Sequence, residues 1–489
     1  MKLRHSIAAA VVLIVVLAAL LLWPSSPKPV PRQVQGFVSM QSTTLAANPD
    51  MGTYTPRAAT YATGNAVNVL GDGSNAAGGI APAFSTHPEP DESWDTVDTN
   101  YTNGAWQACT VDVAPSTCAE KKFRTTVAQT IHLKDDMIRY FGKPGVSHCH
   151  EFFGNKAPTA YSTRKSLRTR NASSAFGFSM QSTAYWEPCW DKTINGKKYA
   201  GSATTNTVYY TVPRDNVNPQ TNKLQYLHTL LGFIGGVNMD DPNDCVVKNE
   251  LDVANGGPGT NCTVTPGRYT YRTNGFIGYA CLLANGVQAD VKGGGYYSRS
   301  FVLADGTDPW EGRCVDGSAI YAEGNAPQCW DGWNVMSPDG YRHFRYAVGD
   351  NTTGAIDVCP NGWYKVPDFE LKTTHPTHGW DDYRYWSLDS DPMMQAKLSA
   401  LGTPRTVMPG ESFHFDWKNG WNKIVLHQML DYCLGLNGPP HECNNNTFNA
   451  TSSLTYPGQL PIKTVDTNNA ATLALIGTVN AAHVNMKGS

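Results

Sequence analysis

The chain contains twelve cysteines, an even number, and no two of them form a Cys-x-x-Cys motif. An even count in an exported protein is typical of disulfide bonds, whereas the missing motif argues against a structural zinc site. We therefore expect a fold whose long loops are held by disulfides. The shortest spacings suggest Cys109–Cys118, Cys245–Cys262 and Cys433–Cys443, although spacing leaves the connectivity open.

The N-terminal segment indicates export. Lys2, Arg4 and His5 precede an apolar run from Ile7 to Trp23. This run is long for a signal peptide and slightly short for a spanning helix, so residues 1–23 form either a signal peptide or an uncleaved membrane anchor. The positive residues before the run direct the following chain out of the cytoplasm. We expect a secreted or extracytoplasmic protein, which contacts the membrane through this segment if it is uncleaved.

Composition favours a β protein and excludes nucleic acid as a partner. The 489 residues carry a formal charge of -3, and only 16% of them are charged. No basic stripe is visible, although nucleic-acid binding requires one. Gly, Thr, Asn, Tyr and Trp are abundant, which is typical of a turn-rich, secreted β protein.

The pattern along the chain predicts one large domain. Residues 24–103 are interpreted as a Pro-, Gly- and Ala-rich stalk with loops, 104–443 as the β-rich domain, and 444–489 as a polar tail. Short runs of β-branched and aromatic residues, such as Thr207–Val212, predict strands. A helix is expected after Asn419 as N-cap, and a shorter one over Met393–Leu401. The predicted fold is mainly β, an antiparallel β-sandwich with disulfide-stapled loops and a C-terminal helix.

Two short stretches carry chemically active residues at i and i+2. His148 and His150 lie in one of them, and His414 and Asp416 lie in the other. In a strand, residues i and i+2 point to the same face, so each stretch can present a pair of side chains to one cleft. Two imidazoles can share a zinc or copper ion, or act as a base and its orienting group. Alternatively, one histidine bonds buried backbone, and Asp416 balances the dipole of the following helix.

A third stretch, Cys329–His343, contains Asp331, Asp339 and His343. Asp331-Gly332 and Pro338-Asp339-Gly340 are turn signatures, so both carboxylates are compatible with turn stabilisation. Two carboxylates with separated pKa values are also the usual apparatus for cleaving glycosidic bonds. Nearby tryptophans supply stacking platforms for sugars, although core packing is their commoner role.

These stretches occur in one order with Ala184-Tyr185-Trp186, Cys359-Pro360 and Asn419-Gly420-Trp421. Together they resemble the family of exported microbial proteins designated domain of unknown function number nineteen ninety-six, over roughly residues 130–435. The resemblance implies that the stretches belong to one domain and that polysaccharide is a plausible neighbour. It implies no established reaction. The chain departs from the family pattern at Glu151, where Asp is expected, and at Cys149, between the two histidines.

The leading hypothesis is an exported enzyme, a hydrolase or lyase, that cleaves a cell-wall or extracellular polysaccharide. Its expected catalytic residues are His150, His343, His414, Asp416, Asp331 and Asp339. Its expected substrate-binding residues are Asn155, Trp186, Trp330, Asn334, Asn419 and Trp421. A first alternative is a protein that binds a divalent metal ion through His148, His150, His343 and His414. A second alternative is a non-catalytic protein that binds cell-wall glycan.

Overall fold

A computed structural model describes residues 47–59, 106–107, 122–169, 173–174, 181–211, 223–224, 227–240, 269–272, 277–350, 355–402, 405–434 and 443–444. The expected N-terminal segment 1–23, most of the stalk and nearly all of the tail lie outside these residues. Within the described ranges, no helix is long and apolar enough to cross a lipid bilayer.

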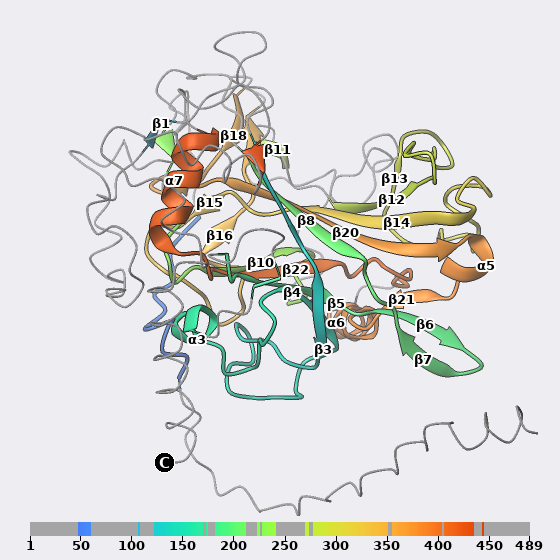
Figure 1. The fold of residues 1–489 in the computed structure, drawn as a ribbon, viewed down its shortest axis with the longest axis horizontal. Helices are drawn as coiled ribbons and strands as arrows, with labels where there is room; N and C mark the ends of the chain where they lie inside the picture. Colours follow the sequence, from blue (N-terminus) through green and yellow to red (C-terminus); the bar gives the residue numbers. More distant parts are fainter. Residues whose placement is uncertain are drawn as a thin grey trace, which may run out of the picture. The chain divides into compact units, whose positions relative to one another are not determined.

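Two large sheets form the centre of the fold (Figure 1). The seven-stranded sheet contains, in spatial order, β13 (Tyr297–Ser298), β12 (Ile277–Leu282), β14 (Asp316–Asn325), β20 (Asp368–His378), β8 (Thr205–Thr211), β2 (Lys122–Val127) and β23 (Cys443–Asn444). The five-stranded sheet contains β10 (Gly232–Gly236), β22 (His414–Lys418), β5 (Ala184–Pro188), β4 (His150–Gly154) and β3 (Gln129–Leu133). Neighbouring strands are antiparallel in both sheets, apart from the parallel pair β2 and β23.

Smaller sheets and four helices complete the described elements. The small sheets are β1 (Trp106–Gln107) with β9 (Lys223–Leu224); β11 (Tyr269–Arg272), β17 (Val348–Asp350) and β18 (Ala355–Val358); β16 (Phe344–Arg345), β15 (Cys329–Trp330) and β19 (Tyr364–Lys365); and β21 (Trp386–Leu388), β6 (Trp190–Ile194) and β7 (Lys197–Ala200). The helices are α3 (Arg164–Thr169), α5 (Trp380–Tyr383), α6 (Asp391–Ala400) and α7 (Lys423–Leu434).

The two large sheets pack face to face through aromatic side chains. Phe369 of β20 lies with its ring centroid 5.0 Å from Trp417 of β22 and 5.6 Å from Phe233 of β10. All three side chains are buried in one continuous apolar core. Large aromatic rings provide most of the buried area in such a layer, about 150–250 Å² each. The predicted antiparallel β-sandwich is therefore confirmed.

The other face of the five-stranded sheet is buried as well; we call it the outer face. Phe152 of β4 and Trp186 of β5 lie there, and Met137, Ile138 and Met336 from the loops pack over them. Because of this second apolar layer, the residues on both faces of the five-stranded sheet are buried. In β22, Phe415 and Trp417 enter the sandwich core, so His414 and Asp416 project toward the outer face.

The two predicted helices are present with shifted starts. Pro392 lies in the first turn of α6, as expected. The C-terminal helix α7 begins at Lys423, not directly after Asn419. Asn419 instead accepts the backbone N–H of Trp421 at 3.0 Å, so it stabilises the turn that precedes the helix.

Three disulfides link the described loops, namely Cys149–Cys189, Cys281–Cys314 and Cys329–Cys359. Such bonds are typical of extracellular or secreted proteins. Cys109, Cys118, Cys245 and Cys262 lie outside the described residues, and Cys433 is disulfide-bonded. The observed bonds close loops of 30 to 40 residues because the sheets bring distant strands together, and they involve none of the cysteines in the three expected short pairs.

Candidate metal centre

Strand pairing in the five-stranded sheet brings two of the predicted segments to the same position along β5. His150 of β4 pairs with Pro188 of β5, and Asp416 of β22 pairs with Trp186 on the other side of β5. Continuing the antiparallel β22–β5 register by two residues places His414 beside Pro188 as well. His150 and His414 therefore flank the end of β5 on the outer face.

His148 approaches these two residues from the segment that precedes β4. Cys149 forms a disulfide with Cys189, the residue that follows β5, and its carbonyl accepts the N–H of Cys189 at 2.9 Å. The N–H of Cys149 donates to Asp389 at 2.6 Å. These contacts fix the chain between the two histidines, so the segment before β4 has little freedom to move.

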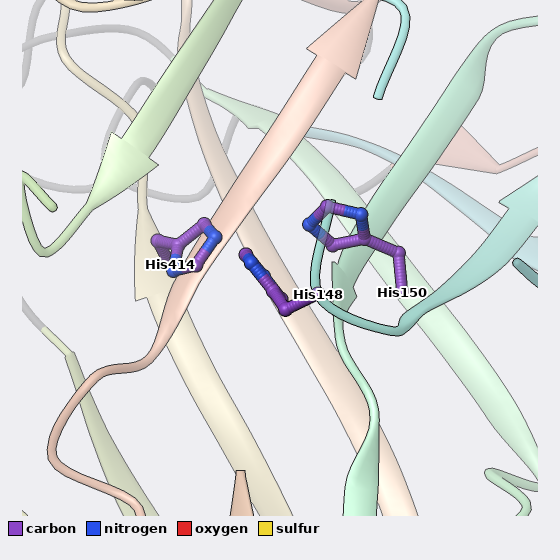
Figure 2. A group of neighbouring side chains, drawn as sticks. All are labelled: His148, His150 and His414. Carbon is purple, nitrogen blue, oxygen red and sulfur yellow. The ribbon is translucent and has the colours of Figure 1, made fainter. Parts of the chain in front are cut away.

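His148, His150 and His414 form one group of imidazoles, which we call the histidine cluster (Figure 2). The ring centroid of His148 lies 4.1 Å from that of His150 and 5.1 Å from that of His414. One ring nitrogen from each residue lies within 4.8 Å of the other two. A tetrahedral zinc ion with bonds of about 2.0–2.1 Å would hold the nitrogens about 3.3 Å apart, so ring shifts of about 1 Å close the site.

The hydrogen bonds of two rings leave a lone pair directed away from the backbone. Nδ1–H of His150 donates to the carbonyl of Asp135, and Nδ1–H of His414 donates to the carbonyl of Ser412, both at 2.9 Å. Each neutral ring then carries its lone pair on Nε2. Metal-binding histidines characteristically fix their tautomer in this manner.

Several polar atoms of the cluster are buried without a partner. Among the described residues, neither ring nitrogen of His148 has a hydrogen bond, nor does Nε2 of His150. Buried polar atoms almost always have a partner, and leaving one unpaired costs about 1–3 kcal/mol. Such atoms make the histidine cluster a candidate ligand site.

Electrostatics keeps the three rings neutral. Burial, and then the neighbouring rings, lower the pKa of His148 well below its ordinary value. Burial also lowers the pKa of His150, and it lowers that of His414 to about 3. A metal ion binds the neutral form of imidazole, so these rings are ready to coordinate at neutral pH.

Asp416 is a buried carboxyl group beside the cluster. Its Oδ2 lies 4.0 Å from Nε2 of His414, and neither of its oxygens has a hydrogen-bond partner within the described chain. Burial raises the pKa of Asp416 well above its ordinary value, and the nearby Asp136 adds to the shift. A cation bound by the histidines would provide the positive charge that this carboxyl group lacks.

Gly236 allows the strands to approach closely at His414. It pairs with His414 across β10 and β22, and its φ is +90°. A Cβ at this position would lie 2.8 Å from the Cα of His414 and 2.9 Å from the carbonyl oxygen of Phe413. Any other residue would therefore push β10 away from the strand that carries His414.

The structure does not bring His343 into the cluster. Its Nδ1 hydrogen-bonds with Oγ of Ser337, and its Nε2 with the carbonyl of Gly232, both at 2.9 Å. Burial lowers its pKa to about 3. Both ring nitrogens of His343 form hydrogen bonds within the protein. The ring therefore has no free lone pair for the reactive or metal-binding role that was expected.

Asp331 and Asp339 stabilise turns next to His343. Oδ1 of Asp331 accepts the N–H groups of Trp333 and Asn334, each at 2.8 Å. Oδ1 of Asp339 accepts the N–H of Tyr341 at 3.1 Å, and its Oδ2 lies 2.6 Å from Nε of Arg342. The turn role, considered from the sequence as the alternative to acid–base catalysis, accounts for these contacts.

The six residues expected to bind substrate are buried, namely Asn155, Trp186, Trp330, Asn334, Asn419 and Trp421. Asn155 donates to the carbonyls of Leu167 and Ser182, and Trp421 donates to the hydroxyl of Tyr210. Trp186 stacks on Phe152 at 5.5 Å. The three tryptophans belong to the two apolar layers, and the structure places none of the six side chains on an open surface.

Sequence reasoning missed a second buried group, Glu151, Glu187 and His375, which we call the glutamate cluster. It lies inside the sandwich, because Glu151 and Glu187 pair across β4 and β5 on the face opposite His150. Nε2 of His375 lies 2.9 Å from Oε1 of Glu151. Only the unusual Glu151 signalled this cluster in the sequence, since its two partners lie in unrelated segments.

A family model described as a domain of unknown function (DUF1996) matches residues 136–421, which is more than half of the chain. No curated protein and no solved structure matches.

Proposed function

Since the chain belongs to the family DUF1996, whose description names no activity, we propose from its geometry that it is an exported metalloprotein. In this proposal, His148, His150 and His414 bind one zinc or copper ion, and Asp416 lies beside it. Both metals accept imidazole ligands. The observation that supports this most directly is that one ring nitrogen from each histidine lies within 4.8 Å of the other two, and that Nε2 of His150 and both nitrogens of His148 are buried without a partner among the described residues.

The arrangement resembles a catalytic centre more than a structural one. Structural zinc sites are closed by four protein ligands, whereas catalytic sites use three and leave a position for water or substrate. Among the described residues, the converging ligand atoms are those of the three imidazoles, and Asp416 is not one of the group. When bound, such an ion polarises a substrate oxygen or acidifies a water molecule.

Polysaccharide cleavage remains our second proposal, now restricted to the metal-loaded protein. A set of three histidine ligands, which is typical of catalytic zinc, favours it over a purely structural ion. In this proposal Asp416, beside the ion, is the carboxyl group of the chain that takes part in cleavage. Asp331 and Asp339 are not required as acid or base.

Metal content tests the first proposal directly. We expect purified protein, stripped with a chelator and reloaded with zinc or with copper, to bind one ion per chain by elemental analysis. The double variant His148→Ala/His150→Ala should bind none. His132→Ala is the matched control, because this partly exposed histidine contacts Gln129 and Glu151 outside the cluster. Equal metal content in all three proteins would refute the proposal.

Incubation with cell-wall glycans tests the second proposal. We expect new reducing or unsaturated ends with metal-loaded protein and none with the stripped protein. Products in the absence of metal would assign any cleavage to another site.

A further inference from the structure

Residues 47–59, drawn in blue in Figure 1, form a segment that lies against the β-sandwich; we call it the strap. After a turn at 49–51 it continues to residue 59 without helix or strand. The strap precedes residues 136–421, which the family model matches, and residues 60–105 connect it to β1. Its contacts with the domain are therefore contacts between two separate segments of the sequence.

The first of these contacts is a buried ion pair. Oδ2 of Asp50 lies 2.7 Å from Nζ of Lys418, at the end of β22, and it also accepts the N–H of Arg164 at 2.6 Å. Lys418 is only 1% exposed, and no other carboxylate of the described residues pairs with it. A neutral residue in place of Asp50 would leave this ammonium group buried without a counter-ion, which is costly. The domain therefore selects an acidic side chain at this position.

The second contact is made by the side-chain amide of Asn334 with the backbone of the strap. Oδ1 of Asn334 accepts the N–H of Thr55 at 2.9 Å, and its Nδ2 donates to the carbonyl of Thr55 at 2.8 Å. The same Nδ2 donates to Oδ2 of Asp331 at 2.6 Å, so the orientation of the amide is fixed by its own turn. Two bonds to one residue's N–H and carbonyl recognise main chain, as a neighbouring strand does when it binds an extended peptide.

The third contact is aromatic. The guanidinium group of Arg57 lies over the ring of Trp333, 5.5 Å from its centroid, which is a cation–π geometry. Nε1 of Trp363 donates to the carbonyl of Ala58 at 3.0 Å. Trp333 and Asn334 belong to the turn that Asp331 stabilises. This turn, which accounts for no part of the metal centre, thus provides two of the three contacts with the strap.

The strap buries little apolar surface of its own. Met51 and Ala59 are partly buried against apolar side chains of the domain, whereas residues 52–53 and 55–58 are exposed. Segments with few buried apolar contacts open at the lowest free energy. The strap can therefore leave its site while the sandwich stays folded.

We propose that Lys418, Asn334 and Trp333 form a docking site for an extended peptide, and that the strap is its ligand, bound reversibly within the chain. The ligand is defined by the carboxylate of Asp50, the backbone of Thr55 and the guanidinium group of Arg57. None of these contacts involves the histidine cluster, so the inference does not depend on the metal centre.

A cut between strap and domain tests the inference on the full chain. A protease recognition sequence inserted between Asn75 and Ala76 allows cleavage after folding, and gel filtration then removes the N-terminal fragment. The probe is a fluorescent synthetic peptide of residues 47–59, followed by fluorescence anisotropy. We expect it to bind the cut protein at least about 10-fold more tightly than the uncut protein, in which the tethered strap competes at a high effective concentration.

Changes in the peptide test each contact without altering the folded protein. Asp50→Asn should weaken binding about 100-fold, because Lys418 stays buried without its counter-ion. N-methylation of the Thr55 amide should weaken it about 10-fold, and Arg57→Ala about 3-fold. Thr53→Ala is the matched control, since Thr53 is exposed, and its affinity should equal that of the unchanged peptide.

Two results would overturn the proposal. An N-terminal fragment that leaves the cut protein only when the sandwich unfolds in urea would make the strap a permanent part of the fold. Equal affinities of the Asp50→Asn and Thr53→Ala peptides would show that the domain does not select the acidic residue.

Discussion

The histidine cluster and the glutamate cluster lie on opposite faces of one sheet and share strand β4. His150 belongs to the first and the adjacent Glu151 to the second, and both side chains are fully buried. Both clusters contain residue types that bind metals. Residue type alone would therefore assign the same role to both.

The two clusters differ in how many of their polar atoms form hydrogen bonds within the protein. In the glutamate cluster, Gln129 donates to Oε2 of Glu151 at 2.8 Å, and Thr373 and Trp190 donate to the two oxygens of Glu187 at 2.6 and 3.0 Å. In the histidine cluster, the ring nitrogens of His148 have no partner among the described residues. The unmet hydrogen-bonding capacity distinguishes a ligand site from a structural polar network.

The strongest test of this contrast compares metal affinity after one change in each cluster. His414→Asn removes one of three ligands, so we expect the dissociation constant to rise about 1,000-fold, equivalent to about 4 kcal/mol. Glu187→Gln should leave it unchanged. Isothermal titration with zinc and copper measures both values. A loss of affinity in Glu187→Gln with none in His414→Asn would place the metal inside the sandwich.

The second test concerns folding stability within the glutamate cluster. Burial raises the pKa of Glu151, but the contact with His375, whose Nε2 lies 2.9 Å from Oε1, outweighs it and lowers the pKa overall, whereas burial and the charge of Glu151 raise the pKa of Glu187 well above its ordinary value. Glu151 is thus ionised and Glu187 protonated. Because Gln imitates only the protonated form, Glu151→Gln should cost about 3 kcal/mol and Glu187→Gln less than about 1 kcal/mol in urea unfolding. Similar costs would contradict these protonation states.

The third test uses pH to separate His414 from His343. Each has a pKa of about 3 when folded, against an ordinary value of 6.5. Between these values the unfolded chain binds more protons, so the free energy of unfolding falls as pH decreases, by up to about 1.4 kcal/mol per unit for each histidine. The raised pKa of Asp416 acts oppositely, since its contribution is lost as pH rises.

We therefore expect metal-free His414→Asn and metal-free His343→Asn each to lose about 1.6 kcal/mol less stability than the wild type between pH 6.5 and 5, measured by urea unfolding. Added metal should stabilise the wild type and His343→Asn, but not His414→Asn. Stabilisation of His414→Asn by metal would place the ion elsewhere.

The smallest expected effect concerns the disulfide beside the histidine cluster. Cys149→Ser/Cys189→Ser frees the segment that carries His148, so metal affinity should fall about tenfold through loss of preorganisation. Cys281→Ser/Cys314→Ser removes a bond in another part of the fold, and it should lower stability while metal affinity stays constant. Calorimetry on the two double variants decides this, and an equal loss of affinity would attribute the effect to general loosening.

Much of the fold follows from local patterns in the sequence. Alternation in strands such as Thr205–Thr211, the turn-rich composition and the helical spacing before Cys433 predict the β-sandwich and the C-terminal helix, which the structure confirms. The i and i+2 spacing also places His414 and Asp416 on one strand face, whereas His148 lies before β4 and reaches His150 from the adjoining segment.

The rest depends on contacts between distant segments. Nothing near His343 in the sequence indicates that the carbonyl of Gly232, 111 residues away, occupies its Nε2. Asp389 lies in no motif, and its bond with the N–H of Cys149, next to His148 and His150, spans 240 residues. His375 likewise meets Glu151 across 224 residues. Local periodicity carries no information about such pairings.

Side chains of β4 point alternately to the two faces of the sheet. An insertion in this strand therefore has a different effect from a substitution. One residue inserted ahead of His150, with the strand still paired as now, would rotate imidazole into the sandwich and carboxylate toward the outer layer. A single frame-preserving insertion would thus damage both polar centres at once, while leaving the amino-acid composition of the strand almost the same. We expect natural variation here to occur by replacement of side chains and to avoid gain or loss of residues between Cys149 and Gly154.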